Sequence, residues 1–315
     1  MAVNPQQEEF RERAVVADTG APGMSTAGAP VRQTSLWRDA WLRYRANKAA
    51  VIAAIFFIAL VAYVIIVPFV SPYDPYAVDF SQAYAPVSLK HPLGCDQYGR
   101  DLFTRVALGG RVSIGIGFAA TIAIMGIGIV YGSISGFIGG RLDNGMMRFL
   151  DALYGLPYLP FAIIVTQLFR TVNIWVMIIA LTIASWFTAA RVVRGQIISL
   201  KENDYVRAAR AVGARWYRIL GRHLLPNTLG VLIVFVFLEL PGVILGEAFL
   251  SFIGLGINPP KASWGSLAQD GRDVYLAHPS MILIPSIAIA WLILSAFFIA
   301  DGLRDALDPR TEGAA

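Results

Sequence analysis

The sequence predicts an all-α membrane protein with six transmembrane helices. Of its 315 residues, 56% are hydrophobic and 15% are charged, and so few charges cannot cover the surface of a soluble domain. The apolar residues gather into six stretches, and the basic residues cluster in two blocks beside them. That placement follows the positive-inside rule of membrane proteins, so the net charge of +5 gives no reason to expect a nucleic-acid partner.

The first 70 residues predict a tail, a surface helix and a first crossing. Residues 1–34 are rich in Ala, Gly and Pro and lack the apolar core of a signal peptide, so we expect a disordered cytoplasmic tail. Between 35 and 48, basic and aromatic residues alternate, which suits a helix at the level of the lipid headgroups. Residues 49–70 carry no charge and would extend about 33 Å as a helix, enough to cross a membrane.

The loop after the first crossing is predicted to lie outside the cell. Residues 32–48 carry five basic and one acidic side chain, whereas residues 72–110 carry three basic and four acidic ones. Because basic residues favour the cytoplasmic side, the N-terminus lies inside and the long loop outside. We therefore group residues 35–110 as one unit, ahead of a domain of five further crossings at residues 111–301.

This outer loop contains the run HPLGCDQYGRDLFTR. We expect it to form a turn-rich lid over the mouth of a path, stabilised by contacts of Asp96, Arg100 and Asp101. His91, Cys95 and Asp96 could instead bind a metal ion, but three ligands in one loop without a second cluster are weak grounds. Cys95 is the only cysteine, which excludes a disulfide within the chain.

The second crossing, residues 112–138, carries three glycines four residues apart. They are Gly128, Gly132 and Gly136. Glycines at this spacing form a flat strip on which another helix can approach closely. We expect the strip to seat a neighbouring helix.

The third crossing, residues 149–169, follows a short inner loop at 139–148 and is interrupted by Gly155 and two prolines. Broken backbone survives in a membrane only where protein or water satisfies it, so this helix should face the bundle or a path. The fourth crossing, residues 174–190, is short and ends at two arginines.

A charged helical stretch at residues 205–227 separates the fourth and fifth crossings. Residues 191–227 carry eight basic and two acidic side chains, which returns the chain to the cytoplasm. Apolar residues recur there at three- and four-residue steps and predict one stripe: Ala208, Ala209, Val212, Trp216, Ile219, Leu220 and Leu224. Arginines surround the stripe: Arg207, Arg210, Arg215, Arg218 and Arg222. Gly213 should join two short helices, because glycine costs a helix interior about 1 kcal/mol, and Pro226 should mark the start of the next crossing. Such a pair could fill a groove on a soluble partner or lie on anionic lipid.

The fifth crossing, residues 229–252, contains the carboxylates Glu239 and Glu247. An acid within a membrane costs a few kcal/mol and normally faces a partner or a watery cavity. Each acid is therefore either hydrogen-bonded to a neighbouring helix or exposed to a path. Our hypothesis is that Glu239 lines a path and favours the cationic end of a substrate.

The chain closes with an outer loop at 257–273, a sixth crossing at 281–300 and a tail at 302–315. Six crossings after an inside start put this tail in the cytoplasm. The four lysines are Lys48, Lys90, Lys201 and Lys261, and none precedes Ser or Thr. A phosphate-binding Gly-Lys-Ser/Thr loop is therefore absent, and any energy from ATP must come from another subunit.

Four runs in order carry a family resemblance. Arg207-Ala208-Ala209, Gly213 and His223-Leu224-Leu225-Pro226 resemble the coupling-helix signature of ABC importer permeases, although the family usually has Glu at the position of Arg207. The His91 to Arg105 run resembles the outer-loop motif of dipeptide and oligopeptide permeases, with Cys95 where Thr is usual. A third run matches at Pro259, Pro260, Ser263, Trp264, Gly265, Gly271, Arg272 and Asp273, and the fourth is the closing DGLRDALDPR.

The resemblance implies the type I ABC importer transmembrane domain with a cytoplasmic coupling helix, and the C-type subunit of the dipeptide, oligopeptide and nickel branch. It implies a permease rather than an enzyme, with no cofactor of its own, in the bacterial inner membrane. The implied partners are a second permease, two cytoplasmic ATPases that bind ATP and Mg, and an external binding protein. Peptides are the expected cargo, and nickel chelates or glutathione stay open.

The resemblance also implies roles for particular residues. The ATPase-coupling set is Arg207, Ala208, Ala209, Gly213, Arg215, Arg218, His223 and Pro226. Asp151 and Glu247 match family positions and join Glu239 as candidate path residues, while His91, Asp96, Arg100, Asp101 and Trp264 belong to the outer loops. The alternative class is an ion-coupled secondary transporter, which tends to show internal repeats and charged half-helices that we do not find.

Overall fold

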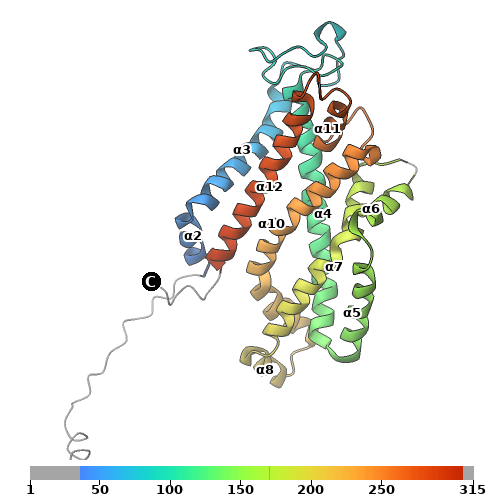
Figure 1. The fold of residues 1–315 in the computed structure, drawn as a ribbon. Coiled ribbons are helices and arrows are strands. Elements are labelled where there is room, and N and C mark those ends of the chain that lie inside the picture. Colours follow the sequence, from blue (N-terminus) through green and yellow to red (C-terminus); the bar gives the residue numbers. More distant parts are fainter. Residues whose placement is uncertain (1–35, 170, 308–315) are drawn as a thin grey trace, which may run out of the picture. The chain divides into compact units, whose positions relative to one another are not determined.

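The computed structural model describes residues 36–169 and 171–307, and this part of the chain is helical apart from its loops (Figure 1). The helices are α2 (Leu36–Ala46), α3 (Lys48–Val70), α4 (Leu102–Ile138), α5 (Gly140–Tyr154), α6 (Tyr158–Gln167), α7 (Ile174–Leu200), α8 (Asp204–Ala211), α9 (Trp216–Ile219), α10 (Leu225–Leu250), α11 (Trp264–Arg272) and α12 (Ser280–Leu307). A 3-10 turn, η1 (Phe80–Gln82), and two π-helical segments, η2 (Leu220–Leu224) and η3 (Ser251–Leu255), complete them. The all-α prediction is confirmed for these residues.

Five helical runs are long and apolar enough to cross a membrane. They are α3, α4, α7, the continuous run from Trp216 to Leu255, and α12. A sixth crossing is possible only if α5 and α6 count as one span, because the two helices meet at an angle of 86°. The predicted interruption of the third crossing is confirmed, and it lies between Tyr154 and Tyr158.

Several helices extend beyond the predicted crossings or lie within the predicted loops. The loops predicted at 139–148 and 257–273 contain helices α5 and α11 instead. Ser263 begins α11 with a capping box, in which its side chain and backbone exchange hydrogen bonds with Ser266. Helix α4 starts at Leu102 rather than 112 because the Asp101 side chain caps it by accepting from the Thr104 amide.

Two later helices also extend past the predicted ends of their crossings. Helix α7 continues to Leu200 and α12 to Leu307, past predicted ends at 190 and 300. The tail predicted from 302 therefore begins as helix, and residues 308–315 lie outside the described residues, as does the predicted tail at 1–34.

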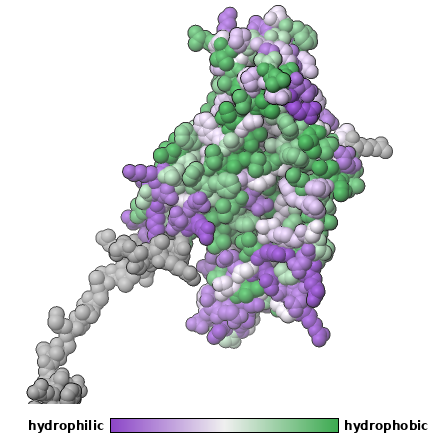
Figure 2. Space-filling model, in the orientation of Figure 1, coloured by the Kyte–Doolittle hydropathy of each residue, from purple (hydrophilic) through white to green (hydrophobic). Residues whose placement is uncertain are grey.

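Within the unit that begins at Asp39, helix α4 is central to the packing. It packs most extensively against α7 and also contacts α3 and α10, while α12 packs against α3, α10 and α11. Figure 2 shows hydrophobic side chains across the middle of the helices and hydrophilic ones gathered around α8. Below, "loop end" means the end with residues 71–101 and α11, and "elbow end" the end with α8 and α9.

The glycine strip seats α7 as predicted. A β-carbon on Gly132 would lie 2.3 Å from the carbonyl oxygen of Ala190, and one on Gly128 would lie 2.5 Å from the Ala189 β-carbon. On Gly136 it would meet the Arg194 carbonyl oxygen at 2.9 Å. The α4 and α7 backbones are therefore in direct contact, which only glycine permits at these positions.

Candidate functional site

Helices α8 and α9 form a two-helix elbow at one end of the molecule, here called the elbow. Gly213 stands between them with φ of +79°, a conformation that glycine adopts without strain. The Ala214 amide donates to the Ala209 carbonyl at 3.0 Å, which closes the turn. The predicted glycine joint is confirmed.

One face of the elbow is fixed to the membrane helices. Val206, Ile219 and Leu224 are buried, and they share the largest hydrophobic core cluster with residues of α4, α7 and α10. Leu220 belongs to the same cluster, and Ala209 packs against it. The inner face of the elbow is therefore closely packed against these helices.

The other face of the elbow is exposed, and this corrects the predicted apolar stripe. Ala208, Val212 and Trp216 point away from the core, and Val212 is 84% exposed. The turn at Gly213 redirects the chain, so residues before and after it do not continue one face. All five arginines that were predicted to surround the stripe are exposed: Arg207, Arg210, Arg215, Arg218 and Arg222.

The elbow passes directly into the next crossing. Helix α10 begins at Leu225, which places Pro226 in its first turn as predicted. His223 lies in the π-helical segment η2, where its carbonyl accepts from Asn227 Nδ2 at 2.6 Å. Because η2 is continuous with both α9 and α10, α9 and this crossing form one helical run, and only α8 is set apart from it by the turn at Gly213.

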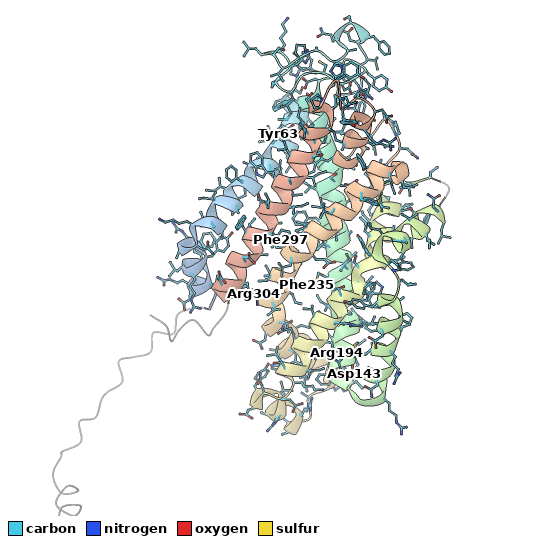
Figure 3. All side chains as sticks on the ribbon, in the orientation of Figure 1. Tyr63, Asp143, Arg194, Phe235, Phe297 and Arg304 are labelled. Atoms are coloured by element: carbon cyan, nitrogen blue, oxygen red, sulfur yellow. The ribbon has the colours of Figure 1, made fainter. Side chains whose placement is uncertain are left out.

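A buried ion pair that sequence reasoning missed ties three helices together near the elbow end. Asp143 of α5 accepts from Nε and Nη2 of Arg194 of α7, each at 2.6 Å, and from the Ser135 hydroxyl of α4 at 2.5 Å (Figure 3). Lys201 donates to the Gly136 carbonyl at 2.9 Å beside it. The sequence pattern did not predict this pair, because residues 139–148 were expected to form a loop rather than the start of α5.

A second, exposed ion pair joins the same two helices about one turn away on α7 and two turns away on α5. Arg191 Nη2 donates to Asp151 Oδ1 at 2.5 Å, and its guanidinium lies 4.0 Å from the centre of the Tyr154 ring. The two pairs border a cleft of about 800 Å³ between α5 and α7. The candidate path residue Asp151 is thus placed at a cavity.

The loop end holds the predicted contacts. Asp96 accepts from the Arg100 amide at 3.0 Å, from Arg100 Nε at 2.7 Å and from Arg105 Nη1. Asp101 accepts from His91 Nδ1 at 3.0 Å and from the Thr104 amide. A metal ion would have to displace these bonds.

Two further features of the loop end bear on the predictions. The pKa of the Cys95 thiol is raised, first by burial and then by Asp101 and Asp96, which keeps the thiol protonated and a poor metal ligand. The loop also reaches the start of α12, because the Tyr84 and His278 rings stack 3.9 Å apart.

Glu247 is enclosed within the helix bundle. It is fully buried, and it accepts from Ser113 of α4 at 2.8 Å and from Ser251 at 2.7 Å. Trp264 of α11, also fully buried, donates through its indole to the Val106 carbonyl of α4 at 2.8 Å. The structure places Glu247 in a packed hydrogen-bond network, where it is not accessible to a path in this conformation.

Glu239 on α10 is half-buried, so it is the more exposed of the two carboxylates in this crossing. Two turns separate it from Glu247, and the continuous helix carries the two acids into different surroundings. It therefore stays a candidate path residue.

Comparison with known proteins matches two family models to this chain. Residues 128–313 match the binding-protein-dependent transport system inner membrane component, and residues 35–86 match the N-terminal transmembrane domain of oligopeptide transport permease C. The oligopeptide permease protein OppC of Bacillus subtilis is 40% identical over 279 residues, which cover 89% of this chain and 91% of that protein. The dipeptide permease protein DppC of Bacillus subtilis is 39% identical over 277 residues, covering 88% and 86%, and OppC of Escherichia coli K12 is 39% identical over 285, covering 89% and 93%. Matched along most of its length, this chain belongs to the family of binding-protein-dependent transport system inner membrane components.

Proposed function

We propose that this chain is one of two permease subunits of an ATP-driven importer of peptides, and that the elbow receives the energy. The relatives named as oligopeptide and dipeptide permeases support the class of cargo. The second permease, two cytoplasmic ATPases that bind ATP and Mg, and an external binding protein complete the complex. The chain itself hydrolyses nothing and sits in the bacterial inner membrane with both termini in the cytoplasm.

The observation that carries the proposal is the two-sided elbow. Its inner face, including Val206 and Leu224, is packed into the core, while its outer face exposes Val212 within a ring of arginines. An apolar centre with a polar rim is the usual anatomy of a protein interface. A basic helix that only rested on lipid would need no such rigid attachment.

The proposed mechanism uses this rigidity. When ATP closes the ATPase pair, the docked elbows of both permeases move together, and the packed core passes the movement to α4, α7 and α10. The crossings then rock between inward-open and outward-open states around a central path. Glu239 lines that path and favours the cationic end of a peptide.

The test is transport by the full complex in proteoliposomes. We expect Ala208→Trp, which disturbs the exposed face, to cut ATP-driven peptide uptake at least tenfold while the permease stays folded. Leu276→Trp is the matched control, because Leu276 is 84% exposed near the loop end and should tolerate the change. Unchanged uptake by the Ala208 variant would contradict the elbow's role. Uptake of nickel chelates or glutathione in place of peptides would reassign the cargo.

A further inference from the structure

The cleft between α5 and α7 has a lining unlike a lipid-facing groove. Its volume is about 800 Å³, within the range of small-ligand sites. The lining residues are Asn144, Met147, Arg148, Asp151, Arg191 and Arg194. Five of these six are charged or polar, and Met147 is the only apolar member.

Some charged side chains in this cleft are held by strong bonds to neighbouring helices, and others are not. Asp143 accepts two hydrogen bonds from Arg194, so the Arg194 guanidinium is already occupied and does not serve a ligand. Arg191 and Asp151 share one bond, with side chains 39% and 65% exposed. Arg191 Nε is buried and makes no hydrogen bond, so Arg191 can meet a ligand only through its Nη groups. Among the described residues, Arg148 forms no ion pair. Besides Arg194, two arginines and one carboxylate therefore line the cleft, and the bond between Arg191 and Asp151 must open for either group to bind a ligand.

The position of the cleft along the helices indicates water rather than lipid. Arg191 lies at the inner end of the predicted crossing, nine residues or about 14 Å before the end of α7. A charged side chain at or within a span normally faces water or a partner. The break between α5 and α6, just past Tyr154, requires the same surroundings.

We propose that this cleft is a section of the path that binds the two charged ends of a peptide. Arg191, with Arg148, receives the C-terminal carboxylate, and Asp151 receives the N-terminal ammonium. This inference rests on the proposed function. An anionic lipid headgroup fits less well, because Asp151 would repel it and Met147 alone cannot hold acyl chains.

The test compares two tripeptides of the same sequence, one with a free carboxylate and one with a C-terminal amide. The complete complex is reconstituted in proteoliposomes, and the binding protein is saturated with either peptide. We expect Arg191→Gln to slow uptake of the free acid about tenfold, the loss of one charge-assisted hydrogen bond, and to change uptake of the amide less than twofold. Arg141→Gln, an exposed arginine of α5 outside the cleft, is the matched control and should alter neither.

Each outcome decides the matter. An equal loss for both peptides would show a structural role for Arg191 and overturn the proposal, as would no loss. If wild-type uptake falls when anionic lipid is omitted and Arg191→Gln abolishes that dependence, the cleft is a lipid site instead. If the wild-type complex accumulates neither peptide with ATP, the proposed function fails, independently of the cleft.

Discussion

The contact of α4 with α7 through the glycine strip gives a quantitative prediction for Gly132→Ala. The added β-carbon would lie 2.3 Å from the Ala190 carbonyl oxygen and 2.9 Å from the Arg194 amide nitrogen. An ordinary carbon–oxygen contact is about 3.3 Å, so the helices must separate by about 1 Å. Because the obstacle is backbone, we take the upper end of overpacking costs, about 3 kcal/mol. Replacing glycine by alanine in a helix returns about 1 kcal/mol, which leaves a net loss of about 2 kcal/mol.

Gly126→Ala is the matched control on the same helix. Nothing lies within 4 Å of its β-carbon position, so this variant should gain about 0.5–1 kcal/mol. The two variants should therefore differ by about 3 kcal/mol in the free energy of unfolding, measured by titrating the permease in mixed micelles with a denaturing detergent. If the two variants unfold within 0.5 kcal/mol of each other, α4 and α7 do not pack through this strip.

Two further predictions concern charged groups. Asp143→Ala should lower the free energy of unfolding by about 2–3 kcal/mol in the same assay, less than the loss of a fully buried pair, because Arg194 is 31% exposed. Asp151→Ala removes an exposed pair and should lower it by under about 1 kcal/mol. Equal losses for the two variants would refute this distinction. Burial raises the pKa of Asp270 to about 6, with Arg100 opposing it, so its contribution to stability is present at low pH and lost as the pH rises through 6. Wild type should therefore lose stability between about pH 4 and pH 6 relative to Asp270→Asn, and parallel pH curves would contradict this.

The elements that could be predicted from sequence are those set by local chemistry. Long apolar stretches predict the crossings, and the four-residue spacing of the glycines predicts a close helix contact that the structure confirms. Gly213 was predictable as a joint because glycine is unfavourable inside a helix, and the structure gives it a φ of +79°. These signals need no knowledge of the partner helices.

The remainder depends on partners far away in sequence. Helix α5 begins with a polar sequence that is typical of a loop, and its Asp143 pairs with Arg194 of α7, 51 residues later in the chain. A pattern was nevertheless present in α5, since Met147, Leu150 and Tyr154 follow at helical steps. The two faces of the elbow could not be separated, because the turn at Gly213 changes which residues share a side.

The most direct test of the coupling surface is the chemical accessibility of position 212. The chain has one native cysteine, Cys95, which is 4% exposed, so a Val212→Cys variant offers one reactive thiol. A Leu89→Cys variant serves as the control, because Leu89 lies at the loop end and its side chain is fully exposed. We predict that assembly with the ATPase subunits slows thiol labelling at position 212 at least tenfold and leaves position 89 unchanged. Equal labelling of position 212 with and without the ATPases, in a complex that still transports, would contradict docking at the elbow.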